Sequence, residues 1–191
     1  MLEDLSQALA QYRDRWPAEA STCARFEELL HDWPGCLDRT HMPGHLTSSA
    51  WVVDPRGTAV ILTHHRKLNV WVQLGGHADG EQDLPQVARR EVAEESGVVA
   101  LRQLGHRWFI LDADVHRIPP YQDVPEHFHY DMRFVFVAEH QQELRISDES
   151  HDVQWVPIDA LADYSQEHSM MRMAAKWTQI RNSSPDLFTL S

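Results

Sequence analysis

Three glutamates lie close together in residues 90–98, Arg-Glu-Val-Ala-Glu-Glu-Ser-Gly-Val. If this segment is helical, Glu91, Glu94 and Glu95 stand at positions i, i+3 and i+4 and project from one face, within about 6 Å of one another. Carboxylates gathered in this way repel one another, and the repulsion grows as water is excluded unless a cation neutralises it. Carboxylate oxygens suit Mg²⁺ or Mn²⁺, so the segment predicts a site for a hard divalent ion.

A helix is predicted over residues 84–96, because a proline lies in its first turn, good helix formers follow, and Gly97 suits its C-terminal cap. Its apolar stripe consists of Leu84, Val87 and Ala88. Glu91 follows Val87 by four residues and Glu95 follows Ala88 by seven, so both glutamates continue this stripe. An acidic helix face is usually solvated surface, but carboxylates that continue a core-facing stripe need partners. We therefore expect a metal site at the edge of the core.

Residues 76–98 resemble the Nudix box, the signature of the Nudix hydrolase family. That signature reads Gly, five residues, Glu, seven residues, then Arg-Glu-apolar-any-Glu-Glu-any-Gly-apolar, and its second half is matched at every position of residues 90–98. The similarity extends more loosely over about residues 45–165. The resemblance implies an α/β fold with a mixed β-sheet sandwiched between helices (α/β/α). It also implies hydrolysis of a diphosphate linkage in a small nucleoside-diphosphate-like substrate.

The first half of the signature departs from the family pattern. After Gly76 and five intervening residues the signature's glutamate position holds Gln82, and Glu81 precedes it by one place. We interpret this as a loop one residue shorter, so that Glu81 takes the part of the family's first glutamate. In the family this residue typically pairs with the box arginine, here Arg90. The resemblance thus implies a structural framework of Gly76, Glu81, Arg90 and Gly97.

The resemblance also implies roles for the remaining residues. The metal ligands are expected to be Glu91, Glu94 and Glu95, with Mg²⁺ or Mn²⁺ as the ion. A metal on the pyrophosphate oxygens offsets developing charge and lowers the pKa of a bound water. Either Glu94 or Glu95 is expected to help deprotonate that water. In many relatives the general base comes from a later loop, where Glu149 is our candidate. Gly76 and His77 are expected to contact substrate phosphate.

The surrounding pattern predicts a helical appendage and connecting loop over residues 1–44, then a Nudix domain over residues 45–191. Strands are predicted at residues 50–53, 59–62, 70–74, 98–104, 107–112, 129–137 and 153–156, and a closing helix at residues 170–180. The first two strands are expected to form a hairpin. The proline-containing residues 115–130 read as a long loop, and long loops of compact domains are often lids or specificity elements.

Composition limits the possible partners. The formal charge of −12 argues against polymeric nucleic acid, whose binding proteins concentrate Lys and Arg. No apolar run reaches membrane-span length, the first residues do not resemble a signal peptide, and only two cysteines are present. We therefore expect a cytoplasmic protein with no membrane partner and a small-molecule diphosphate substrate; a homodimer is left open.

Histidine is unusually abundant, with 13 residues, about three times ordinary usage. His127 and His129 would share one face of a strand. Six others lie in or beside predicted loops: His41, His45, His64, His65, His77 and His116. A second site, for zinc or another transition metal, is one interpretation. Ordinary hydrogen bonding or substrate contact is the commoner role of histidines without regular metal-ligand spacing.

Two alternatives to a hydrolase remain at this stage. The irregular position of Gln82 suits a catalytically inactive Nudix-fold module that binds or regulates. The histidine count suits an isoprenoid diphosphate isomerase, because isopentenyl-diphosphate isomerase resembles some Nudix proteins and uses His with Glu at its metal. That isomerase also needs a catalytic cysteine in the core domain, and none follows Cys36 here.

Overall fold

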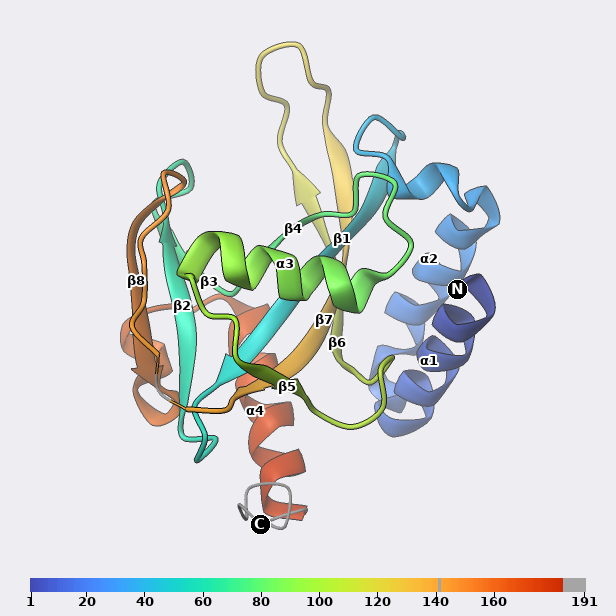
Figure 1. The fold of residues 1–191 in the computed structure, drawn as a ribbon. Helices are drawn as coiled ribbons and strands as arrows, with labels where there is room; N and C mark the ends of the chain where they lie inside the picture. The colour runs from blue at the N-terminus through green and yellow to red at the C-terminus, as the bar shows by residue number, and fades with distance from the viewer. Residues whose placement is uncertain (141, 184–191) are drawn as a thin grey trace.

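The computed structural model describes residues 1–140 and 142–183, which form a mixed eight-stranded sheet with helices packed on it (Figure 1). The helices are α1 (Leu2–Arg15), α2 (Ala20–Leu29), α3 (Leu84–Ser96) and α4 (His168–Ser183). The strands are β1 (Gly44–Val53), β2 (Ala59–His65), β3 (Val70–Val72), β4 (Leu74–His77), β5 (Leu101–Gln103), β6 (Ile110–Ile118), β7 (His127–Ala138) and β8 (Ser150–Pro157). The α/β fold predicted from the sequence is confirmed.

Strand β1 lies at the centre of the sheet. It pairs in parallel with β7 along its whole length, from Gly44 opposite Phe128 to Val53 opposite Val137, and antiparallel with β4 on its other edge. Strand β2 meets β1 only at Val53 and then pairs with β3 and β8. The predicted hairpin of residues 50–53 and 59–62 is therefore wrong beyond its turn, because β4 and β7 occupy most of the edges of β1.

The long loop predicted at residues 115–130 is also wrong. Strands β6 and β7 form an extended antiparallel hairpin with Val115 opposite Tyr130 and Ile118 opposite His127. Figure 1 shows this hairpin projecting beyond the rest of the sheet. The three prolines of the segment all lie in the short connection between the strands, where the missing N–H groups interrupt no ladder.

The two faces of the sheet bury two sets of apolar side chains. Along β1, Leu46, Ala50 and Val52 pack with α1, α2 and α3, whereas Trp51 and Val53 pack with α4. This alternation follows from the two-residue repeat of a strand. Residues of the N-terminal helices join the first core, so the segment predicted as an appendage covers part of the sheet; the division into residues 1–44 and 45–191 stays a prediction. Among the described helices, none is long and apolar enough to cross a membrane.

Charged side chains are buried between α4, α1 and the sheet. Asp112 is fully buried and accepts hydrogen bonds from Arg133 at 3.0 Å, Arg172 at 2.8 Å and Lys176 at 2.6 Å. Arg133 also donates to Asp131 at 2.7 Å. Burial opposes ionisation of Asp112, but the hydrogen bond from Arg172 and the charges of Arg133 and Lys176 outweigh it and lower its pKa. These carboxylates are thus neutralised by cations of the chain itself.

Candidate active site

Helix α3 begins and ends as the sequence predicts. The side chain of Asp83 accepts from the Gln86 N–H at 3.4 Å at the N-terminus. At the other end Gly97 adopts a left-handed conformation with φ of 74°, and its N–H donates to the Ala93 carbonyl at 3.0 Å. The Ser48 hydroxyl donates to the Leu84 carbonyl at 2.6 Å, which attaches the helix to β1. The orientation of the box glutamates is set by these contacts.

Two adjacent glycines of β4 let the backbone approach the glutamates closely. The Gly75 N–H donates to Glu95 Oε2 at 2.9 Å. A Cβ at Gly76 would lie 2.6 Å from the Glu91 carboxyl carbon, closer than real side chains allow. Only glycine therefore fits at residue 76 with Glu91 in this position. The structure places Gly76 beside the predicted ligands, although it does not show a substrate contact.

Two of the three glutamates are withdrawn from water. Glu95 is 7% exposed, and burial raises its pKa to about 8, opposed by the Gly75 hydrogen bond and reinforced by the charge of Glu91. Burial also raises the pKa of Glu91, where Arg90 opposes the shift and Glu94 adds to it. The sequence predicted that these two residues continue the core-facing stripe. Their burial agrees with that prediction.

Glu94 lies off this stripe, with 59% of its side chain exposed. Arg90 contacts Glu91 at 3.0 Å and Glu94 at 3.8 Å, so the box arginine lies among the box glutamates. A single arginine beside several carboxylates leaves negative charge in excess. Glu94 can therefore join a metal only from the solvent side of the helix.

Glu81 occupies the loop before α3 and accepts a hydrogen bond from the Asp83 N–H at 2.9 Å. Glu81 and Arg90 line the same surface hollow, together with Ala78, Asp79, Gln86 and Val87. Among the described residues, Arg90 forms ion pairs with Glu91 and Glu94, and it also donates to the His77 carbonyl at 3.5 Å. The structure thus brings Glu81 near Arg90 without pairing the two.

Glu149 comes from a distant part of the chain, immediately before β8. Its carbonyl accepts from the Arg66 N–H at 2.9 Å, which fixes this end of the loop to the segment after β2. Its negative charge contributes to the raised pKa of both Glu91 and Glu95, so the carboxylate lies within electrostatic range of the two. The structure therefore brings the sequence-predicted base toward the box glutamates.

His77 lies next to the glycines but belongs to a second group of side chains. Its ring centroid is 5.2 Å from that of His45 and 4.9 Å from that of His129. Burial, with the positive charge of Arg39, lowers the pKa of His77 to about 4, so the imidazole is neutral near pH 7. It can offer a hydrogen bond or a lone pair to a ligand, but no charge to a phosphate.

Neither cysteine has the environment of a reactive thiol. Cys23 and Cys36 are buried and free, and burial raises the pKa of both, that of Cys36 to about 11. A thiol with a raised pKa is a poor nucleophile because it is rarely ionised. Neither residue therefore supplies the catalytic thiol that the isomerase alternative needs.

A family model and several solved structures match the chain. The family model described as NUDIX domain matches residues 43–177. No curated protein sequence matches the chain. Among solved structures, a C. elegans Ap4A hydrolase binary complex superposes with a TM-score of 0.58 and 14% identity, covering 72% of this chain and 98% of that one.

Two further structures are similar over most of their length. The E. coli dihydroneopterin triphosphate pyrophosphohydrolase has a TM-score of 0.54 and 14% identity, covering 70% of this chain and 95% of that one. The NUDIX domain of Shewanella oneidensis NrtR, complexed with ADP ribose, has a TM-score of 0.50 and 17% identity, covering 81% of this chain and 97% of that one. At these identities the likeness establishes a shared fold.

Proposed function

The chain belongs to the Nudix hydrolase family, and from this premise we propose that it catalyses divalent-metal-dependent hydrolysis of a diphosphate linkage in a small nucleoside-diphosphate-like substrate. The observation that carries the proposal is the pair of carboxylates at Glu95, which is buried, and at Glu91, whose side chain is only 14% exposed. Their pKa values are raised, and within the described residues the only ion pair of either is that of Glu91 with Arg90. Ionised together, they require an added cation.

The donor set fits a hard dication. Glu91 and Glu95 supply carboxylate oxygens beside the glycines of β4, and the exposed Glu94 is proposed as a third ligand that turns toward them when the ion binds. Mg²⁺ and Mn²⁺ prefer oxygen ligands and leave positions for phosphate and water, so either ion suits this set. When bound, such an ion would polarise the phosphoryl oxygens and lower the pKa of the attacking water.

The residues of the chain then have distinct tasks. The oxygen of water attacks a phosphorus atom, the bridging P–O bond breaks, and the bonding electrons leave with the departing phosphate. The Glu149 carboxylate is our candidate to accept the proton of that water, because its charge acts on both box glutamates. Gly76 leaves room for the Glu91 carboxylate beside the strand and stays our candidate for a substrate contact, and Arg90 lies between Glu91 and Glu94.

A small diphosphate ligand is the class of partner that suits the fold, and a protein with a net charge of −12 needs a cation to bind it. The solved relatives support this class, since one is called an Ap4A hydrolase and another holds ADP ribose. Two buried free thiols suit a reducing compartment such as the cytoplasm, which we propose as the location. The described residues point to no particular base or leaving group.

A substrate panel tests the proposal. The purified full chain is incubated with dinucleoside polyphosphates, nucleoside diphosphate sugars, nucleoside triphosphates and CoA derivatives, each with Mg²⁺, Mn²⁺ or a chelator. The proposal predicts release of a phosphomonoester from at least one compound class, and abolition of that release by the chelator. A panel in which no compound is cleaved with either ion contradicts it.

The same panel separates the alternatives. Thermal stabilisation by a nucleotide without product would favour an inactive binding module. Conversion of an isoprenoid diphosphate to its isomer would favour the isomerase.

A further inference from the structure

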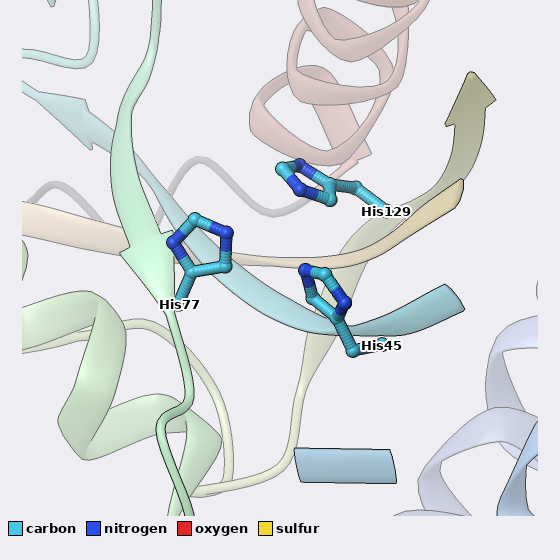
Figure 2. Close-up of side chains that lie close together, drawn as sticks. All are labelled: His45, His77 and His129. Carbon is cyan, nitrogen blue, oxygen red and sulfur yellow. The ribbon is translucent and has the colours of Figure 1, made fainter. Parts of the chain in front are cut away.

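Three histidines from three neighbouring strands point toward one another on one side of the sheet (Figure 2). His45 on β1 lies directly opposite His129 on β7, and His77 on β4 lies opposite Thr47, two places along β1 from His45. The three ring centroids are 4.9 to 5.2 Å apart. One nitrogen from each ring lies within 4.8 Å of the other two. The register of the sheet thus gathers three imidazoles around a common point.

The His45 ring is oriented so that one nitrogen has no partner. Its Nδ1 lies 3.3 Å from the His41 carbonyl, which can only accept, so Nδ1 carries the proton. In that tautomer Nε2 carries the free lone pair, and this atom is buried without a hydrogen-bond partner among the described residues. A buried polar atom without a partner is costly. A backbone carbonyl that fixes one ring nitrogen and frees the other is the usual arrangement at a histidine metal ligand.

A fourth histidine repeats this arrangement. His127 Nδ1 lies 2.9 Å from the Pro125 carbonyl, and its Nε2 lies 3.3 Å from His129 Nε2. Its ring also stacks on His45, with centroids 5.0 Å apart. In a tetrahedral zinc site with Zn–N bonds of 2.0–2.1 Å, two ligand nitrogens are about 3.3 Å apart. The spacing between His127 and His129 therefore equals that of two ligands on one ion.

Hydrogen bonding within the cluster is the competing explanation. It accounts for one contact, because a proton on His129 Nε2 could be donated to His127 Nε2. It leaves His45 Nε2 unpartnered, and no hydrogen bond joins His45 to His77 or His129 in the described part of the chain. A metal ion would satisfy the lone pairs of all three rings together.

We propose that His45, His77 and His129 bind a borderline transition-metal dication of the Zn²⁺ class, with His127 as an additional ligand. The nitrogen donors of His45, His77 and His129 are within 4.8 Å of one another, so rotations that bring these three together by about 1.5 Å give zinc geometry. Imidazoles select Zn²⁺, Co²⁺ or Ni²⁺ over Mg²⁺, whereas the box carboxylates have the opposite preference. The chain then has two cation sites of different chemistry.

Strand β4 separates the two sites. Gly76 approaches the Glu91 carboxyl on the side of α3, and the next residue, His77, points to the opposite side of the sheet, as successive strand residues do. The two sites therefore share no ligand, and a substitution can remove a ligand of one site while the ligands of the other stay intact.

Cobalt spectroscopy on the full chain tests this site without any substitution. The metal-free protein, prepared with a chelator, is titrated with Co²⁺. The proposal predicts saturable uptake of about one ion per chain with the intense visible absorption of a four-coordinate nitrogen site, and displacement by Zn²⁺ but not by excess Mg²⁺. Absence of that absorption, or its displacement by Mg²⁺, overturns the proposal.

Matched variants assign the ligands. His45→Ala, and separately His129→Ala, should weaken Zn²⁺ binding on the order of 100-fold or more, while His31→Ala, an exposed histidine outside the cluster, should leave it unchanged. Glu95→Gln should remove hydrolysis but retain the cobalt spectrum, which distinguishes this proposal from the proposed function. Circular dichroism confirms that each variant is folded. Retention of the spectrum in both histidine variants, or its loss in Glu95→Gln alone, contradicts the assignment.

Discussion

Carboxylates are buried in two regions of this protein, with opposite electrostatic consequences. Between α4 and the sheet, Asp112 and Asp114 face Arg133 and Arg172, and these cations lower the pKa of both despite burial. On α3, Glu95 is buried with a raised pKa of about 8. The first region carries counter-ions for its carboxylates, whereas Glu95 has no ion-pair partner among the described residues, since Arg90 pairs with Glu91 and Glu94. The comparison separates a structural ion network from a site that takes its cation from solution.

The largest expected effect is on hydrolysis and comes from substitution of Glu95 on α3. Glu95→Gln keeps the size and burial of the side chain but removes a metal ligand, so we expect hydrolysis to fall on the order of 10³-fold, in line with the several kcal/mol that metal ligation contributes to transition-state stabilisation. Steady-state kinetics on the compound found in the substrate panel measures it. Because the substitution also removes a buried carboxylate, the metal-free protein should not lose stability. Unchanged turnover would remove Glu95 from the proposed site.

Substitutions in the ion network between α4 and the sheet should lower the free energy of unfolding. Arg133→Met leaves Asp112 and Asp131 with fewer partners in a buried environment and should destabilise the fold by about 3–5 kcal/mol. Urea unfolding of the wild type and the variant measures the difference. The matched control is Arg13→Met, which breaks an exposed pair with Glu27 and should cost less than about 1 kcal/mol. Equal effects of the two substitutions would contradict the structural role of the network.

The two regions should also titrate in opposite directions. In the folded protein the pKa of Glu95 is about 8, above its ordinary value of about 4.3. The contribution of protonated Glu95 to stability is therefore fully present below about pH 4.3 and is lost as the pH rises toward about 8. In a chelator the melting temperature should fall on the order of 10 °C over this window. Glu95→Gln should remove this decrease.

The network titrates on the acid side. Because the pKa values of Asp112 and Asp114 are lowered in the folded protein, the two ionised side chains stabilise the fold above about pH 3.9. This contribution is lost as the pH falls further. Acid unfolding below pH 4 should therefore persist in Glu95→Gln and be altered in Arg133→Met. Melting curves of the three proteins from pH 3 to 9 check both windows. A metal-free wild type that becomes more stable from pH 5 to 8 would contradict the account of Glu95.

The smallest expected effect is at the exposed glutamate. Glu94 lies on the solvent side of α3 with 59% of its side chain exposed, so Glu94→Gln should reduce turnover by about 10- to 100-fold, less than Glu95→Gln. Kinetics at several Mn²⁺ concentrations separates weaker metal binding from slower chemistry. If turnover and metal dependence were both unchanged, Glu94 would not be a ligand.

The local parts of the site were predictable from the sequence. Helix α3 has the predicted bounds because the early proline, the helix formers and the apolar stripe agree over its 13 residues and Gly97 follows them. The same stripe identified Glu91 and Glu95 as turned toward the core, whereas Glu94, which the sequence placed on the same helix face, is exposed. Signals of this kind depend on neighbours along the chain.

The non-local parts were not predictable. The pairing of His45 with His129 depends on a parallel register between strands about 80 residues apart, and no period along the chain reveals it. Only the alternation of His127 and His129 was visible beforehand. The prolines near residue 120 also suggested a long loop, because the sequence does not show that β6 and β7 end beside them. The buried network had no sequence signal, since Arg133 lies within an ordinary strand pattern.

The most direct test of the central claim is the number of protons released when the box glutamates bind a metal. Calorimetric titration of Mn²⁺ into the metal-free protein at pH 7, in buffers of different ionisation enthalpy, measures this number. Because Glu95 has a pKa of about 8, binding should release about one proton per ion from the wild type, and Glu95→Gln should release almost none while binding more weakly. Binding of equal strength in both proteins, with no proton released from either, would contradict the account.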